Sequence, residues 1–122
     1  MFNINEIKHK NENLSQAAMV VILDPKDRVL ILKRPGDLKA ERFPNKWCLA
    51  GGGGLEGETP KENAIRETLE ETGIKIELKD LYYLLNKQDG DKKYFFFYAR
   101  TNKQPKIMNV LDEHEEFKWV RA

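Results

Sequence analysis

The chain has little of what many small proteins use for covalent stability or metal binding. It contains one cysteine, Cys48, so it can form neither an internal disulfide nor a thiolate zinc cluster. Its two histidines, His9 and His114, lie in separate polar segments without a second nitrogen or sulfur at ligand spacing. We therefore expect no zinc site, and we expect Cys48, beside Trp47, to be a small buried side chain rather than a reactive thiol.

Long apolar runs and an excess of one charge are also lacking. The longest apolar stretch near the N-terminus, Ala17 to Leu23, is too short to span a bilayer, and nothing before it has the layout of a signal peptide. The 21 basic and 20 acidic residues leave no strong field to attract nucleic acid or a membrane. We expect a cytoplasmic protein that binds a nucleotide-sized substrate, with neither a membrane nor a stable nucleic-acid partner.

The length of 122 residues suits one domain, residues 1–122, and the chain shows no internal repeat, low-complexity segment or linker. Apolar and β-branched runs predict strands at 16–23, 28–34, 47–49, 74–78, 81–87, 93–100 and about 115–120. The turn residues Asp24-Pro25-Lys26-Asp27 predict a hairpin between the first two strands, and residues 35–46 read as a loop. Strands therefore outnumber helices.

The most regular pattern lies between Gly52 and Ile74, GGGLEGETPKENAIRETLEETGI. Thr59 and Glu62 form a capping box around Pro60, which suits the first position of a helix. Gly73 can take the left-handed conformation that ends a helix. The sequence thus predicts a helix over residues 60–72.

Acidic residues crowd one side of this helix. At about 100° per residue, Ile65, Leu69 and Thr72 share one side, with Thr68 at its margin, so we expect this side to face the core. The opposite side carries three carboxylates, which belong to Glu67, Glu70 and Glu71. Such like charges repel one another, and a hard cation such as Mg²⁺ would neutralise them. The alternative is an ordinary solvated acidic face.

Four consecutive glycines, Gly51 to Gly54, precede the helix. Because glycine lets a backbone approach a ligand closely, a metal-bound pyrophosphate could rest on this segment, which we expect to be a loop. A plain flexible hinge is the alternative. The position of the segment between a strand and an acidic helix favours ligand binding.

Taken together, these spacings resemble the Nudix box, the signature of the Nudix hydrolases. The matching residues are, in order, Gly52, Glu58, Arg66, Glu67, Glu70, Glu71, Gly73 and the apolar Ile74. Three positions depart from the common pattern: Ala50 replaces a proline, Leu55 stands where a glutamate is usual, and Thr68 occupies an apolar slot. The glycine run is also one residue longer, since Gly54 holds the place of an apolar residue. These departures affect the path of the glycine segment rather than the carboxylates.

The resemblance implies a role for each matching residue. Glu70 and Glu71 would ligate Mg²⁺, for which Mn²⁺ can substitute, and the Gly52 carbonyl would add a further oxygen. Glu67 would be another ligand or the general base. Arg66 would orient these carboxylates, and Glu58 would support the glycine segment and the helix through hydrogen bonds or a salt bridge.

Other residues are implicated less directly. Gly51, Gly52 and Gly53 would hold the pyrophosphate, and Lys33 and Arg34 would lie near the phosphates unless they form an ordinary charged strand end. Glu113 is the first candidate for a further carboxylate from a loop, although solvated acidic loops are common. The aromatic run from Tyr94 to Tyr98 reads as a buried central strand, with a base-stacking platform as the alternative.

The resemblance further implies the Nudix fold, an α/β (α+β) architecture in which a mixed β-sheet is sandwiched by helices. The family normally adds a helix after the last strand, and we expect this C-terminal helix to be absent or truncated here. A large apolar sheet face is rarely left bare. Residues 1–14, residues removed from the chain or the second subunit of a homodimer could cover it.

The implied activity is hydrolysis of a nucleoside diphosphate linked to another group. Within this class we favour a nucleoside or deoxynucleoside triphosphate, cleaved to the monophosphate and pyrophosphate. A dinucleoside polyphosphate is the alternative substrate, because Glu113-His114 resembles a pair found in those hydrolases. An RNA 5′ triphosphate is disfavoured by the lack of a basic stripe. A non-catalytic Nudix-like nucleotide-binding module would typically lack some of the box glutamates, which are all present here.

Overall fold

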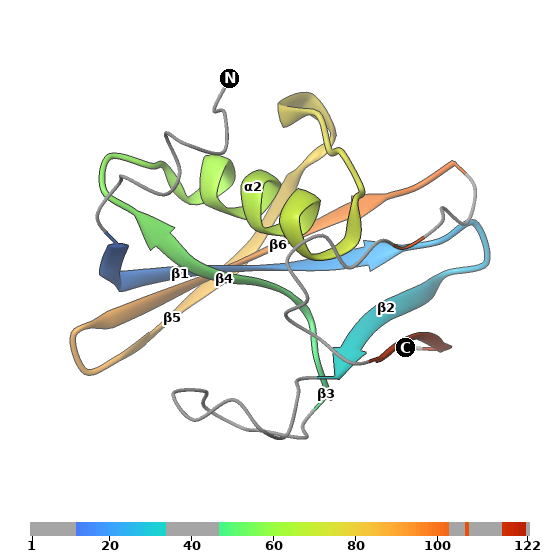
Figure 1. Ribbon diagram of the computed structural model, residues 1–122, viewed down its shortest axis with the longest axis horizontal. Helices are drawn as coiled ribbons and strands as arrows, with labels where there is room; N and C mark the ends of the chain where they lie inside the picture. The colour runs from blue at the N-terminus through green and yellow to red at the C-terminus, as the bar shows by residue number, and fades with distance from the viewer. Residues whose placement is uncertain (1–11, 34–46, 103–106, 108–115, 122) are drawn as a thin grey trace.

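The computed structural model describes residues 12–33, 47–102, 107 and 116–121, drawn in colour in Figure 1. These residues form a mixed sheet of seven strands, one α-helix and one short 3₁₀ helix. The elements are, in chain order, β1 (Glu12–Leu23), β2 (Arg28–Lys33), β3 (Trp47–Cys48), β4 (Ala50–Leu55), α2 (Pro60–Thr72), η1 (Leu78–Asp80), β5 (Tyr82–Asp89), β6 (Lys92–Arg100) and β7 (Glu116–Arg121).

Strand β1 is the centre of the sheet. It pairs in parallel with β6 along one edge, and along the other edge it pairs antiparallel with β4 and then, at Leu23, with β2. Strand β5 extends the sheet beyond β6, while β3 and β7 both pair with β2. The helix α2 lies across one face of this sheet, over β4 and β1 (Figure 1).

Most of the predicted elements are confirmed. The hairpin between β1 and β2 turns at Asp24–Asp27, and α2 has the predicted bounds. The predicted strand over residues 74–78 is wrong, because this extended segment has no ladder partner among the described residues and leads into η1. Its alternation has another cause: Ile74 and Ile76 are buried against the core, whereas Lys75 points to solvent.

Alternate residues of β1 form the middle of the hydrophobic core. Ala18, Val20 and Ile22 are fully buried, and in the parallel register Val20 lies opposite Phe97 and Ile22 opposite Ala99. Ala64 of α2 and the Ile74–Ile76 segment join the same cluster. The core therefore holds α2 on the face of the sheet that β1, β4 and β6 share.

The aromatic run lies in β6, between β1 and β5, so it occupies an interior strand as predicted. Only Phe97 of the run is buried, however, and Tyr94, Phe95, Phe96 and Tyr98 are half-buried. The neighbouring edge strand β5 carries exposed Tyr82, Tyr83, Leu84 and Leu85. In the described part of the chain, the single α-helix covers one face of the sheet. The homodimer that could cover more of the sheet stays a prediction. None of the described helices is long and apolar enough to cross a membrane.

Candidate metal and catalytic site

The ends of α2 are fixed by its caps. Thr59 Oγ1 accepts a 3.1 Å hydrogen bond from the Glu62 backbone amide, and the Glu62 carboxylate accepts a 2.9 Å bond from the Thr59 amide. Pro60 occupies the first turn, and Gly73 ends the helix with a φ of 79°. These local contacts set where α2 starts and stops.

The glycine segment forms strand β4, so the expectation of a loop is wrong. Glycine is a poor strand residue, but its backbone pairs with β1, where Ala18 lies opposite Gly52 and Met19 opposite Gly51. A Cβ on Gly51 would stand 2.1 Å from the Ala18 carbonyl oxygen, and its φ is 143°. Glycine at this position therefore allows the two backbones to lie side by side.

The polar side of α2 packs directly on this glycine strand. Residues one helical turn apart follow it in reverse order, from Glu71 through Glu67 to Asn63. Glu71 Oε1 accepts a 2.7 Å hydrogen bond from the Gly51 amide. The Glu67 carboxylate lies so close to Gly52 that a Cβ there would stand 2.8 Å from Oε2. Gly52 thus leaves the room that the Glu67 carboxylate occupies.

The predicted core side of α2 is confirmed in part, because Thr68 and Thr72 are fully buried and Ile65 packs against the core. It is wrong at Leu69 and Glu71. Leu69, expected in the core, is 44% exposed, whereas Glu71, expected on the opposite side, is 6% exposed. The side chains of Glu67 and Glu70 are only 13% and 14% exposed. The inward side includes polar residues because the glycine strand offers backbone polar groups and space. A solvated acidic face is therefore excluded.

Arg66 joins the carboxylates into one network. Its Nε and Nη2 donate to the two oxygens of Glu58 at 2.7 and 3.2 Å. Its Nη1 donates to Glu67 at 3.1 Å and to Glu70 at 3.0 Å, and Nη2 also donates to the Gly53 carbonyl at 3.0 Å. One guanidinium therefore connects three carboxylates with the backbone of β4.

The network keeps Arg66 charged although it is buried. Burial alone lowers the pKa of Arg66, but the hydrogen bonds of Glu58 and the charges of Glu67 and Glu70 outweigh burial, and the pKa is raised. Glu58 is itself buried and accepts a 2.8 Å bond from the Leu55 amide. Glu58 therefore ties the end of β4 to the middle of α2.

The polar side of α2 and the neighbouring backbone of β4 offer the type of donor atom that a divalent cation binds. Glu67, Glu70, Glu71 and the Gly52 carbonyl offer oxygen atoms only, the donors that Mg²⁺ prefers, on one band of α2 and β4. In the described residues no three Asp, Glu, His or Cys side chains gather closely enough to hold an ion as they stand. Instead, Arg66 and the Gly51 amide hold the carboxylates in this arrangement.

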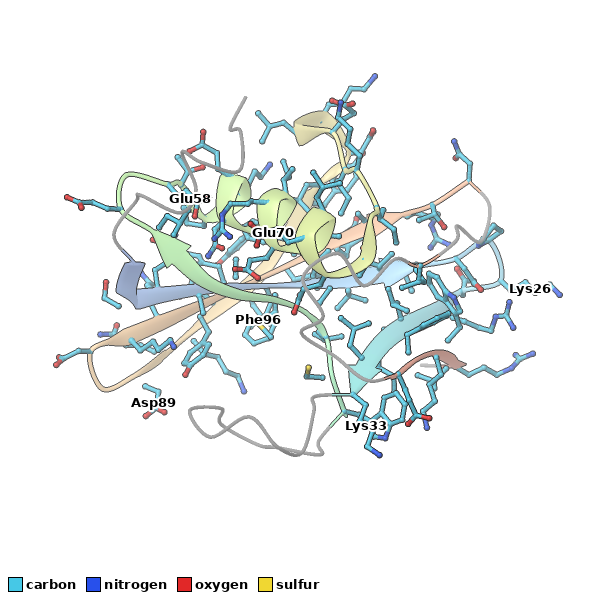
Figure 2. All side chains as sticks on the ribbon, viewed as in Figure 1. Lys26, Lys33, Glu58, Glu70, Asp89 and Phe96 are labelled. Carbon is cyan, nitrogen blue, oxygen red and sulfur yellow. The ribbon has the colours of Figure 1, made fainter. Side chains whose placement is uncertain are left out.

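Not all predicted site residues come together. Figure 2 shows Lys33 at the end of β2, apart from Glu58 and Glu70 beside α2, and its Nζ lies 3.7 Å from a carboxylate oxygen of Glu116. Arg34 and Glu113 lie outside the described residues. The carboxylates of α2 and the Gly51–Gly53 backbone are therefore the part of the predicted site that the structure brings together.

Asn63 joins this site although no sequence pattern had marked it as a site residue. This side chain is fully buried, donates to the Gly52 carbonyl at 3.3 Å and accepts from Arg66 Nη2 at 3.2 Å. Two signals could have identified it: asparagine is unfavourable inside a helix, and position 63 lies one turn before Glu67 on the acidic side.

Comparison with known proteins places this site in a family. The family model of the NUDIX domain matches residues 13–122. A prenyl-diphosphate phosphatase from Methanosarcina mazei is 27% identical over 116 residues, which make up 92% of this chain and 66% of that protein. Nudix hydrolase 3 from Caenorhabditis elegans is 36% identical over 72 residues, 59% of this chain and 29% of that protein. The chain thus spans only part of the length of these curated relatives.

Solved structures share the fold. A MutT/nudix family protein from Enterococcus faecalis superimposes with a TM-score of 0.74 at 23% identity, over 97% of this chain and 51% of that chain. A bifunctional NMN adenylyltransferase/ADP ribose pyrophosphatase from Francisella tularensis, solved with AMP and a Mn ion, has a TM-score of 0.67 at 22% identity, over 94% of this chain and 36% of that one. Because the family model covers nearly the whole chain and the fold agrees with these structures, this chain belongs to the Nudix hydrolase family.

Proposed function

We propose that this chain is a Mg²⁺-dependent hydrolase that cleaves the phosphoric anhydride of a nucleoside diphosphate linked to another group. The observation that carries the proposal is the acidic side of α2 packed on the glycine strand, with more carboxylates than Arg66 can neutralise. Within this class we propose a nucleoside triphosphate as substrate, cleaved to the monophosphate and pyrophosphate. The nearly even charge balance of the chain supports a small substrate.

The reaction joins a water oxygen to a phosphorus of the bridge, breaks the bond from that phosphorus to the leaving phosphate, and releases a proton. Glu70, Glu71 and the Gly52 carbonyl would hold Mg²⁺, which supplies neutralisation of phosphate oxygens and a lowered pKa of bound water. Glu67, which lies against Gly52, would accept the proton or serve as a further ligand. Arg66 keeps Glu67 and Glu70 in place.

A second candidate substrate is an organic diphosphate. The M. mazei relative, aligned with 92% of this chain, is named a prenyl-diphosphate phosphatase. Hydrolysis of such a substrate requires the same neutralisation of phosphate oxygens by the metal. It also requires a different pocket for the organic group. A dinucleoside polyphosphate stays the alternative among nucleotides. An Ap4A hydrolase from C. elegans shares the fold, with a TM-score of 0.67 at 24% identity.

A substrate panel tests this proposal. The chain is incubated with Mg²⁺ and nucleoside triphosphates, dinucleoside polyphosphates or prenyl diphosphates. Released phosphate is measured with and without pyrophosphatase, and the mononucleotides formed from dinucleoside polyphosphates are separated by anion-exchange chromatography. Phosphate that appears from a triphosphate only after pyrophosphatase treatment supports cleavage to monophosphate and pyrophosphate. Saturable nucleotide binding without turnover of any substrate would instead identify a binding module.

Glutamate-to-glutamine substitutions in α2 test whether the proposed metal ligands are needed for turnover. We expect Glu70→Gln and Glu71→Gln each to lower turnover by more than about 100-fold, because loss of groups that only orient a metal ligand already costs about 10- to 100-fold. Glu77→Gln, which removes an exposed carboxylate outside α2, is the matched control. Near-normal rates in Glu70→Gln and Glu71→Gln would refute the assigned ligands.

A further inference from the structure

Asn63 is a buried amide in the interior of α2, with none of its side chain exposed. Asparagine lowers helix stability at such a position, because its side chain competes for backbone hydrogen bonds. A buried amide is also costly unless its donor and acceptor both find partners. The position therefore needs an explanation beyond helix formation.

Both ends of the Asn63 amide have partners of fixed chemistry. Arg66 can only donate, so the atom that receives its Nη2 at 3.2 Å must be the amide oxygen. The Gly52 carbonyl can only accept, so the atom 3.3 Å from its oxygen must be the amide nitrogen. These two contacts determine the orientation of the amide without reference to any other neighbour.

The two contacts converge on groups that the proposed chemistry uses. A carbonyl oxygen has two lone pairs, so the bond from Asn63 does not by itself prevent the Gly52 oxygen from binding an ion. In the other contact, the Asn63 amide oxygen accepts from Arg66 Nη2. The same nitrogen also donates to Glu58 and to the Gly53 carbonyl. Asn63 thereby links the position of the Gly52 carbonyl to the position of the Arg66 guanidinium.

The glycine at position 54 makes room for this amide. A Cβ on Gly54 would stand 3.3 Å from Asn63 Nδ2 and 3.7 Å from its Cγ, so a larger side chain would displace the amide. Position 54 is where the resemblance to the Nudix box leads us to expect an apolar side chain. In this chain the amide of Asn63 lies beside that position instead.

We infer that Asn63 is a positioning residue, which fixes the Gly52 carbonyl and the Arg66 guanidinium in the arrangement needed to bind a divalent cation. This inference rests on the proposed function, because it concerns the same site. It differs from a packing role, since it depends on the two polar atoms of the amide and not on its volume.

Two substitutions separate positioning from packing. Asn63→Leu keeps the number and branching of the side-chain heavy atoms without a donor or acceptor, and Asn63→Ala removes both the branched group and its polar atoms. We expect both variants to bind Mn²⁺ about 10- to 100-fold more weakly, measured by electron paramagnetic resonance of free Mn²⁺, as for other groups that orient a metal ligand. We also expect kcat to fall while KM for the nucleotide, at saturating metal, stays unchanged.

Thr68→Val is the matched control on the same helix. Thr68 is buried, and its hydroxyl has no hydrogen-bond partner within the described residues, so the substitution removes a polar atom without breaking a contact of the site. We expect wild-type Mn²⁺ affinity and turnover in this variant. Weakened binding here as well would show that any polar loss in α2 has this effect, and would overturn the inference.

The outcomes also separate the inference from the proposed function. Wild-type Mn²⁺ affinity in Asn63→Leu, with nucleotide turnover present in the wild type, overturns the inference alone. Mn²⁺ binding that depends on Asn63, without turnover of any substrate, supports the inference and refutes the proposed hydrolysis. A wild-type protein that binds no Mn²⁺ overturns both.

Discussion

Two buried charged groups, Asp24 in the β1–β2 turn and Arg66 on α2, are surrounded in different ways. Asp24 is fully buried and accepts bonds from the amides of Lys26 and Arg28, both at 2.9 Å, and from Arg28 Nε at 2.8 Å. These partners lie within four residues along the chain. The charges of Asp24 and Arg28 balance, and their contacts close a turn.

Arg66 instead contacts residues of α2, of β4 and of the turn that joins them. A single guanidinium contacts the carboxylates of Glu58, Glu67 and Glu70, so within this described cluster the carboxylates outnumber it. Such an excess is unfavourable in a partly buried site unless a cation completes it. The balanced cluster at Asp24 is local and closes a turn, whereas carboxylates that outnumber their arginine and lie between α2 and β4 indicate a candidate binding site.

Removal of the arginine should lower the free energy of unfolding by very different amounts in the two clusters. In Arg66→Met, three carboxylates lose their shared partner, and we expect the free energy of unfolding to fall by about 3–5 kcal/mol, as when a buried ion pair is broken. In Arg28→Met we expect a much smaller loss, because Asp24 keeps two backbone donors. Urea unfolding at pH 7 measures both values, and equal losses would refute the distinction.

Substitution of two neighbouring glycines should distinguish a loss of turnover from a loss of stability. In Gly52→Ala the new Cβ displaces the Glu67 carboxylate, a flexible group, so we expect turnover to fall by up to about 100-fold while the free energy of unfolding changes by less than about 1 kcal/mol. In Gly51→Ala the Cβ meets the backbone of Ala18 at a positive φ, so we expect a loss of stability. Rate assays and thermal unfolding of both variants check this contrast, and a Gly52→Ala variant with wild-type turnover would contradict it.

The smallest effect concerns the acid stability of the turn. Burial alone raises the pKa of Asp24, but the hydrogen bonds from Arg28 and Lys26 outweigh it, and the pKa lies below the ordinary value of 3.8. The charged form therefore stabilises the fold fully above the ordinary pKa, and this stabilisation is lost as the pH falls through the lower, folded-state pKa. We expect the wild type to exceed Asp24→Asn in stability at pH 7 by a margin that shrinks below about pH 4. A margin that stays constant down to pH 2 in urea unfolding would contradict this cause.

Features specified by neighbouring residues could be predicted from the sequence. The bounds of α2 follow from Thr59, Glu62 and Gly73, whose caps depend only on nearby backbone. The β1–β2 hairpin follows from its turn residues in the same way. The spacing of the box glutamates likewise predicts that α2 carries the candidate site.

Features set by distant backbone could not be predicted. The glycines of β4 have no side-chain pattern, and their strand forms because β1 offers a ladder partner. The orientation of α2 depends on this strand, since Gly52 and Gly54 leave space for Glu67 and Asn63, whereas the apolar Leu69 is exposed. The contacts of Glu71 with Gly51 and of Asn63 with Gly52 follow from that same register of helix on strand.

The claim that the acidic side of α2 is a divalent cation site is tested most directly by metal-dependent stability. Thermal unfolding is followed at increasing Mg²⁺ in the wild type, in the double variant Glu70→Gln/Glu71→Gln, and in the exposed control Glu77→Gln. We predict that Mg²⁺ at about 100 times its Kd stabilises the wild type and the control by about 2.7 kcal/mol and leaves the double variant unchanged. Equal stabilisation of all three proteins, or no stabilisation of the wild type, would contradict the account.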